Sequence, residues 1–335
     1  MKNRRQFLKE AATGALLLGT QSRLGLAAAP EPHATADKSR VVVARDPNVY
    51  SSPGQLDQNR VMALLDRAVT SWTGQSNSVE AWKLILGKDL GPDKVIGLKT
   101  NGLGGKGICT HYALILAVVE RLQHAGIKAG NIVIWDRNRE DLEVCGLSIN
   151  TDPSRIRCFG TDHAGYEDES VRWGSVNIRL SKILTRECSM VIGLPILKDH
   201  SMSGVTFAMK NMYGVVHWPF QLHGGGCNPG IADLNCIPAV REKVRFTIGD
   251  ALSSVYDGGP GFHPERLWYP NALIVGEDRV AVDQIAWQII ERKRAEAGMK
   301  TLEAAGRPPR YIATAADAAH NLGTDDPRHI HLMEI

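Results

Sequence analysis

The sequence predicts an α/β fold with a mainly parallel central sheet flanked by helices and an irregular, loop-rich insertion. Short apolar runs of the length of buried strands alternate with longer segments whose apolar residues recur at helical spacing. Such alternation is typical of parallel sheets, whose strands need crossover connections. Further along, a stretch rich in Gly, His and Pro lacks any periodicity, which predicts the insertion.

The first half of the chain is expected to alternate between strands and helices. Apolar runs mark the strands, and apolar residues at every third or fourth position mark the helices. Thr110 is expected to cap the second helix and Gly126 to end it. The elements predicted here are a strand at 40–44, a helix over 59–72, a strand at 94–98, a helix over 111–124 and a strand at 131–135.

The second half is less regular, and we assign residues 39–335 to a single α/β domain. Pro195 indicates an edge or a bulge near the end of the buried strand at 190–197. The loop over 217–234 is long for a connection without structure, which itself indicates function. The other elements predicted are strands at 155–159 and 175–180, a helix over 205–212, strands at 245–249 and 271–275, a helix over 278–294, and a helical turn and short strand after 304.

The N-terminus carries a pattern typical of an export signal. Arg4 and Arg5, followed by Phe-Leu-Lys, precede a short apolar run, and small residues at 27–29 offer a cleavage site. This pattern resembles a twin-arginine signal peptide. We therefore expect residues 1–29 to be a signal peptide, residues 30–38 to be a linker, and the protein to reach the periplasm already folded through the twin-arginine export machinery.

Charge and cysteine content argue against several classes of protein. Residues 1–29 carry a net charge of +4, so the remaining residues account for −1 of the chain's total of +3. The basic balance thus belongs to the signal and not to a nucleic-acid surface. No later apolar run is long enough to span a membrane. The six cysteines include no Cys-x-x-Cys pair, which disfavours a ferredoxin-type iron–sulfur cluster, while one or two disulfides stay open.

Polar residues follow four of the predicted strands at the point where each strand ends. Open parallel sheets bind ligands at the carboxyl ends of their strands, so these residues are expected to meet at one edge. The alternative is that strands end in polar residues simply because loops are solvated. The residues are Lys99, Thr100 and Asn101, then Asp136, then Lys198, Asp199 and His200, and finally Asp250.

These residue types suggest an anion site with acid–base chemistry. Lys99, Lys198 and Lys210 would hold a phosphate or carboxylate, or act as a base or Schiff-base amine, and we count them as catalytic candidates. His200, the fourth catalytic candidate, would exchange protons near neutral pH. Carboxylates would balance the lysines or hold a cation. The carboxylate candidates are Asp136, Asp250 and Asp283.

The segment 102–107, Gly-Leu-Gly-Gly-Lys-Gly, has the glycine spacing of a dinucleotide-binding loop. However, polar residues interrupt the strand before its first glycine, and the acidic residue Asp136 lies far beyond its last one. Dinucleotide binding is therefore disfavoured. A general anion site at the N-terminus of the following helix fits the sequence better.

A second constellation lies in the loop over 217–234. His217, His223 and Cys227 stand close together in the sequence and could bind a divalent metal ion such as zinc, copper or iron. Their spacing matches no strict metal-binding signature. The alternative is a packed loop with incidental histidines.

Several separated motifs resemble those of the domain-of-unknown-function family 362 (DUF362), in its exported branch. They are Lys-Thr-Asn at 99–101 followed by Thr110-His111, the segment 193–214, Asp-Ala-Leu from 250, the Gly-Gly-Pro-Gly turn, and Val-Ala-Val-Asp ending at 283. The resemblance covers about residues 90–295 and implies no established activity. Some relatives are labelled iron–sulfur proteins, but their cysteine clusters are missing here. The residues that match the family's recurrent polar positions by this resemblance are Lys99, Asn101, Lys198, His200, Lys210, Asn211, Asp250 and Asp283. Our ligand-binding candidates are Asn101, Thr110, His111, Asp136, Asn211, Asp250 and Asp283.

Together these observations favour an exported enzyme or cofactor-dependent protein that binds an anionic small molecule, with or without a metal, at the strand ends. A non-catalytic periplasmic binding or assembly factor that carries a metal or small anion to a partner is one alternative. A redox protein associated with iron–sulfur chemistry is another. The sequence indicates neither a nucleic-acid partner nor a membrane span after the signal.

Overall fold

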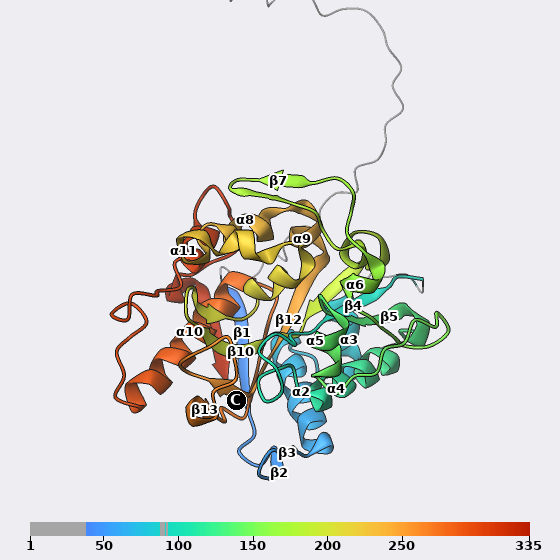
Figure 1. Ribbon diagram of the computed structural model, residues 1–335. Helices are drawn as coiled ribbons and strands as arrows, with labels where there is room; N and C mark the ends of the chain where they lie inside the picture. Colours follow the sequence, from blue (N-terminus) through green and yellow to red (C-terminus); the bar gives the residue numbers. More distant parts are fainter. Residues whose placement is uncertain (1–37, 88–90, 92) are drawn as a thin grey trace, which may run out of the picture. The chain divides into compact units, whose positions relative to one another are not determined.

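The computed structural model describes residues 38–87, 91 and 93–335, and residues 38–335 form one compact unit (Figure 1). The expected signal peptide at 1–29 and nearly all of the expected linker at 30–38 lie outside the described residues. Among the described residues, no helix has the length and apolar character needed to cross a membrane.

The unit is built on an 11-stranded mixed sheet that is mainly parallel. The strands from β12 to β6 run parallel to one another, whereas β14 is antiparallel to both of its neighbours. This confirms the predicted fold class. The order across the sheet is β15 (Ile330–Glu334), β1 (Ser39–Arg45), β14 (Ala272–Gly276), β12 (Val244–Val255), β9 (Met190–Gly193), β4 (Ile96–Lys99), β5 (Ile132–Trp135) and β6 (Arg157–Cys158).

Shorter strands extend this sheet or form separate hairpins. β10 (Ile196–His200) pairs with β12 and with β11 (Gly204–Thr206), and β13 (Leu267–Trp268) pairs with β12. The two separate hairpins are β2 (Tyr50–Ser52) with β3 (Gln55–Leu56), and β7 (Val171–Trp173) with β8 (Val176–Ile178).

Helices cover both faces of the sheet (Figure 1). The α-helices are α2 (Gln58–Thr73), α3 (Ser78–Leu86), α4 (Tyr112–His124), α5 (Arg139–Glu143), α6 (Thr161–Ala164), α7 (Gly224–Cys227), α8 (Gly230–Cys236), α9 (Pro238–Lys243), α10 (Arg279–Glu296) and α11 (Tyr311–Ala316). Short 3₁₀ turns are η1 (Ala129–Asn131), η3 (Lys210–Val215), η4 (Pro219–His223), η5 (Pro264–Arg266) and η6 (Pro327–His329), and η2 (Ile183–Glu187) is a π-helical turn.

Alternation along the strands divides the core between the two faces. In β1, Val42 and Ala44 pack in a cluster with α2, α3 and α4, whereas Val41 and Val43 pack in another cluster with α10. Successive side chains of a strand point to opposite faces, so a strand that is apolar throughout is covered on both sides. The apolar runs in the sequence therefore correspond to strands that helices cover on both faces of the sheet.

The segment after β9 departs most from the sequence prediction. The expected single strand at 190–197 is two strands, β9 and β10, with Pro195 between them. The helix expected over 205–212 is wrong: β11 occupies its start and η3 its end. Between them, backbone N–H groups are bound by a side chain of α10 instead of by a helical turn. The expected structureless loop over 217–234 contains η4, α7 and most of α8.

Candidate functional site

The carboxyl ends of the parallel strands form one polar edge. Lys99, the last residue of β4, is in register with Trp135 of β5 and with Gly193 of β9. The residues that follow these strands therefore emerge at the same level of the sheet. Asp250 joins this edge because its backbone N–H donates to the carbonyl oxygen of Pro195 (2.8 Å).

Lys99 and Asp136 form a buried ion pair at this edge. The Lys99 Nζ lies 2.5 Å from Asp136 Oδ1 and also donates to the carbonyl oxygen of Thr100 at 2.7 Å. Asp136 further accepts the backbone N–H groups of Gly102 (2.9 Å) and Arg137 (2.8 Å). The carboxylate thus ties together β4, the end of β5 and the start of the glycine-rich loop, so it is not free to bind a ribose.

Two asparagine amides connect this ion pair to a second lysine. Asn211 Oδ1 accepts from Lys99 Nζ (3.4 Å) and from Asn101 Nδ2 (3.0 Å). Asn101 Oδ1 in turn accepts from Lys198 Nζ at 2.9 Å. All of these side chains are buried. We call this group, Lys99, Asn101, Asp136, Lys198 and Asn211, the lysine network.

Lys198 is a fully buried cation that has only neutral partners. Besides Asn101, its Nζ donates to the carbonyl oxygens of Leu103 and, at 3.5 Å, of Ile108. Across the described residues, no ion pair within 4.0 Å involves this lysine. Burial lowers its pKa to about 8, although the charge of Asp136 acts in the opposite direction.

The glycine-rich loop closes directly over Lys198. A Cβ atom at Gly104 would lie 2.9 Å from Lys198 Nζ and 2.7 Å from the carbonyl oxygen of Pro260, and the φ angle of Gly104 is +125°. Only glycine fits so close an approach. The loop therefore binds a side-chain cation through its carbonyl groups, which is the reverse of a loop that binds phosphate through its N–H groups.

A second lysine cluster lies at η3 and α7. Lys210 Nζ lies 3.5 Å from Cys227 Sγ and 3.8 Å from the ring centroid of Tyr213. Burial lowers the pKa of Lys210 to about 8, with Cys227 opposing the shift. The rings of His200 and His223 are stacked beside it, with centroids 6.0 Å apart. Lys210, Tyr213, His200, His223 and Cys227 are called the η3 cluster below.

His200 is placed at this cluster as a neutral hydrogen-bond acceptor. Burial, together with the charge of Lys210, lowers its pKa to about 2. Its Nδ1 accepts the backbone N–H groups of Met202 (3.1 Å) and Ser203 (3.3 Å). In this arrangement His200 holds the turn after β10 together, and an exchange of protons near neutral pH would require movement of that turn.

The three residues considered for a metal are not brought together as a set. His217 Nδ1 accepts the backbone N–H of Arg179 at 3.1 Å, while His223 Nδ1 contacts the carbonyl oxygen of Pro219 at 3.1 Å. Cys227 faces Lys210. Within 38–87, 91 and 93–335, no group of three His, Cys, Asp or Glu side chains is arranged to hold a metal ion. All six cysteines are free thiols.

Thr110 and His111 connect α4 to the polar edge in a manner that the sequence prediction missed. Thr110 does not cap α4. Its hydroxyl donates to the carbonyl oxygen of Leu194 (2.6 Å) and accepts the N–H of Asn101 (2.8 Å). His111 holds the N-cap position without a side-chain capping bond. Its backbone N–H and its Nδ1 both lie 2.8 Å from Asp250 Oδ2.

Sequence reasoning also missed Ser253, whose hydroxyl lies 3.2 Å from the Nε2 of His111. The strand expected at 245–249 was too short, because β12 continues to Val255. The apolar residues Ala251 and Leu252 after Asp250 were the available signal, because they indicate that the strand continues to Ser253.

Asp283, a buried residue of α10, binds the backbone of the segment that precedes η3 and acts as a structural residue. Its two carboxylate oxygens accept the backbone N–H groups of Ala208 (2.7 Å) and Met209 (3.1 Å). These residues immediately precede Lys210 and Asn211. Burial raises the pKa of Asp283 to about 7, although both N–H groups favour the charged form. Asp283 therefore positions the segment that supplies the η3 cluster.

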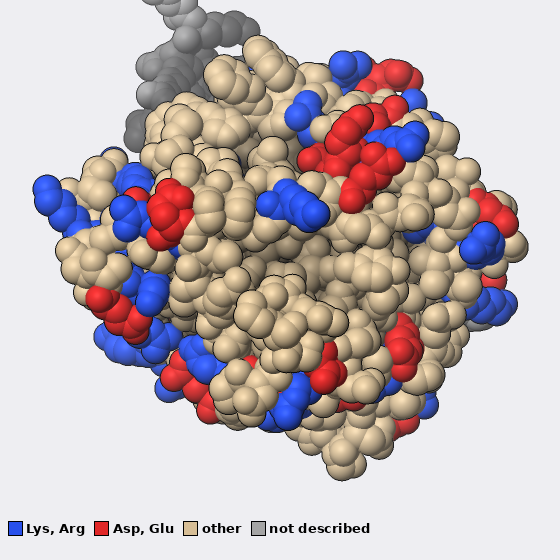
Figure 2. All heavy atoms as spheres, turned by 60° about the horizontal axis from the view of Figure 1, so that its bottom comes forward, with Lys and Arg blue, Asp and Glu red and all other residues tan. Residues whose placement is uncertain are grey.

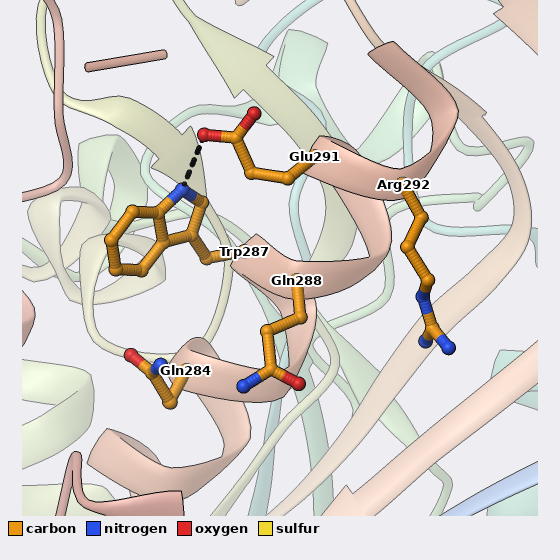
Figure 3. A pocket seen from close by; sticks show the side chains of 5 residues that line it. All are labelled: Gln284, Trp287, Gln288, Glu291 and Arg292. Carbon is orange, nitrogen blue, oxygen red and sulfur yellow. Dashed lines mark hydrogen bonds between the residues drawn. The ribbon is translucent and has the colours of Figure 1, made fainter. Parts of the chain in front are cut away.

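A surface depression of about 420 Å³ lies on another part of the molecule, along one face of α10. Figure 3 shows its side chains on successive turns of that helix, with the indole of Trp287 donating to Glu291 Oε1 at 3.0 Å. It contains no residue of the lysine network. Its lining residues are Gln284, Trp287, Gln288, Glu291 and Arg292.

The face shown in Figure 2 carries charges of both signs. Lysine and arginine side chains stand beside aspartate and glutamate around the rim, and the middle is formed mostly by uncharged residues. This mixed surface on that face does not resemble the continuous basic stripe of a nucleic-acid interface.

Comparison with known proteins gives a family and distant structural likenesses. The model of the family described as "Domain of unknown function (DUF362)" matches residues 96–288. The fold is similar to the crystal structure of a Thermotoga maritima protein from the Northeast Structural Genomics Consortium, at 13% identity and a TM-score of 0.44. The match covers 71% of this chain and 59% of that one, so the chain spans about three fifths of that protein. No curated protein matches the chain.

Proposed function

The chain belongs to the domain-of-unknown-function family DUF362, and we propose that it is an exported enzyme that binds an anionic small molecule at the carboxyl ends of its parallel strands. The lysine network and the η3 cluster supply the binding groups. Lys198 binds the anion, and the neighbouring lysines supply further positive charge.

The burial of Lys198 without a carboxylate is the observation that carries this proposal. A buried ammonium group costs several kcal/mol unless an opposite charge compensates it. Carbonyl and amide oxygens satisfy its hydrogen bonds but leave its charge unbalanced. A phosphate or carboxylate group at this position would restore the balance. It would reach Nζ by replacing the carbonyl groups of the glycine-rich loop.

The lowered pKa values support chemistry beyond binding. Lys198 and Lys210, each with a pKa of about 8, exist in both protonation states near neutral pH. An amine of this kind can donate or accept a proton within the pH range in which the protein works, which an ordinary lysine cannot. This property favours an enzyme over a passive anion carrier.

Replacement of Lys198 by methionine tests the binding site. We expect Lys198→Met to weaken the binding of inorganic phosphate at least about tenfold, because a hydrogen bond to a charged group is worth roughly 1.5–3 kcal/mol. Thermal stability should stay the same or rise, because the change removes a buried charge. Isothermal titration calorimetry with phosphate and, in parallel, with acetate measures the affinities.

Lys106→Met is the matched control, since Lys106 is an exposed lysine of the same loop. It should leave both affinities within about twofold. For the unmodified protein, phosphate affinity should fall about tenfold between pH 7 and pH 9, as Lys198 loses its proton near pH 8. If neither anion binds, or if both lysine variants bind equally well, the proposed anion site is wrong.

Export is tested separately at the N-terminus. We expect the double change Arg4→Lys and Arg5→Lys to abolish transport, because the paired arginines are what the twin-arginine machinery reads. Cell fractionation and immunoblotting should then show the full-length precursor in the cytoplasm. Arg23→Lys, which alters an arginine outside the pair, should still give the shortened protein in the periplasm. Equal export of both variants would contradict the twin-arginine route.

A further inference from the structure

We propose that Ser253, His111 and Asp250 form a catalytic triad that cleaves carboxylic esters through an acyl-serine intermediate. This goes beyond the anion site proposed above, because it assigns a reaction and a nucleophile that the lysine network lacks. The two arrangements lie next to each other, since Thr110 binds the backbone of Asn101 and precedes His111 directly.

The three side chains are connected in the order that this chemistry requires. Ser253 Oγ lies 3.2 Å from His111 Nε2, and His111 Nδ1 lies 2.8 Å from Asp250 Oδ2. The nucleophile and the orienting acid thus bind opposite nitrogens of one imidazole ring. A triad is recognised by this geometry and these roles, and not by the order of its residues along the chain.

Asp250 is held in the position in which it orients the ring. It is fully buried, and its carboxylate also accepts the backbone N–H groups of His111 (2.8 Å) and Leu252 (3.1 Å). Because the carboxylate can only accept, Nδ1 of His111 carries the proton, and the lone pair of Nε2 faces the serine hydroxyl. The ring is therefore fixed in the tautomer that can remove a proton from Ser253.

The surroundings of Ser253 offer a hydrogen-bond donor and one partly exposed side chain. The buried hydroxyl of Tyr50 lies beside Ser253, with which it interacts, and near the charge of Asp250. Burial and the charge of Asp250 raise the pKa of Tyr50, so the hydroxyl stays protonated. It is suited to donate to a developing oxyanion. The His111 side chain is 22% exposed, whereas Ser253 and Asp250 are buried behind it.

The reaction balances with the ester and water alone. Ser253 Oγ attacks the ester carbonyl carbon while its proton passes to His111 Nε2. The tetrahedral intermediate collapses, the C–O bond to the alcohol breaks, and the alcohol leaves with the proton from His111. Water, deprotonated by the same nitrogen, then attacks the acyl-serine. The second tetrahedral intermediate formed in this way collapses, releases the carboxylic acid and returns the proton from His111 to Ser253. The charge on imidazolium is stabilised by Asp250 throughout.

The adjacent residue Ser254 provides a matched control within the same strand. It is also buried, but its hydroxyl has no partner in the part of the chain that the structure describes. A serine on β12 therefore does not need a histidine partner for burial. The contact between Ser253 and His111 is specific to one of two neighbouring serines.

The experiment uses the full chain with a fluorophosphonate probe and with p-nitrophenyl acetate. We expect the probe to label the unmodified protein at Ser253, as located by peptide mass spectrometry. We expect Ser253→Ala to lower the rate of p-nitrophenyl acetate hydrolysis at least about 100-fold, and Asp250→Asn to lower it comparably, because triad members act as a unit. Ser254→Ala should keep both the label and the rate.

Failure of a variant to fold does not decide the outcome, because the labelling site is determined in the unmodified protein. The triad would be overturned if the label is absent from Ser253 in that protein. It would also be overturned if a folded Ser253→Ala variant hydrolyses p-nitrophenyl acetate at the full rate. Phosphate titration of Ser253→Ala separates the two proposals. Its phosphate affinity should be unchanged, since Ser253 is outside the lysine network. The anion site is tested by the phosphate affinity of Lys198→Met instead.

Discussion

Replacement of Asp136 by alanine is expected to lower the free energy of unfolding by about 3–5 kcal/mol, because it leaves the buried ammonium group of Lys99 without a counter-charge. The pair is 2.5 Å apart, and both side chains are almost fully buried. The change also leaves the backbone N–H of Gly102 without its acceptor. Chemical denaturation followed by circular dichroism gives the difference.

A double-mutant cycle separates the charge from the hydrogen bonds. Asp136→Asn retains an acceptor for the backbone but removes the negative charge, so it should still destabilise the protein. Adding Lys99→Met should recover part of that loss, because no unpaired charge then remains buried. Asp168→Ala, at an exposed carboxylate, should change stability by less than about 0.5 kcal/mol. If Asp136→Ala leaves the free energy of unfolding unchanged, water must reach the Lys99 ammonium group, and the predicted cost is wrong.

Replacement of Asp283 by alanine is expected to destabilise the protein by roughly 2–4 kcal/mol, because two buried backbone N–H groups at Ala208 and Met209 lose their acceptor. The segment they belong to carries Lys210 directly afterwards. We therefore also expect weaker phosphate binding, measured by calorimetry on protein that denaturation curves show to be folded. The neighbouring change Gln284→Ala, at the surface depression of α10, should affect neither quantity.

The pKa of Asp283 gives this prediction a pH signature. Burial raises the folded-state pKa to about 7 from an unfolded value of 3.8. Between these two pH values the folded protein therefore keeps the Asp283 carboxyl protonated, whereas the unfolded chain does not. The contribution of this group to stability is therefore present below about pH 4 and is lost as the pH rises to about 7. Asp283→Asn cannot titrate and should show a flatter stability profile over that range. If both proteins show the same dependence of stability on pH, the raised pKa of Asp283 is wrong.

Much of the site could be predicted from strand ends alone. Lys99, Asp136 and Lys198 each follow an apolar run, and parallel strands bring their carboxyl ends to one edge whatever the details of packing. The structure does bring these three together through two asparagine amides. The resemblance of several motifs to DUF362 was likewise visible in the sequence, and the family match over residues 96–288 confirms it.

The parts that could not be predicted depend on partners far away in the sequence. Asp283 binds N–H groups 75 and 74 residues earlier, and Ser253 meets a histidine 142 residues earlier. These contacts also explain two errors. The helix expected over 205–212 is missing because Asp283 holds the backbone there. Thr110 does not cap α4 because its hydroxyl bonds to Leu194 instead.

The sequence by itself determined the α/β class and the polar character of the strand ends, since these follow from local periodicity and from which residues end each apolar run. It also indicated the family, through the resemblance of its motifs. Only the tertiary structure decided what each polar residue does. In the structure, Lys198 is a buried cation without a counter-charge, His200 is a neutral hydrogen-bond acceptor, and Asp250 is the partner of a histidine. The reason is physical: burial and long-range hydrogen bonds set the charge state of a side chain, and neither can be read from neighbouring residues in the chain.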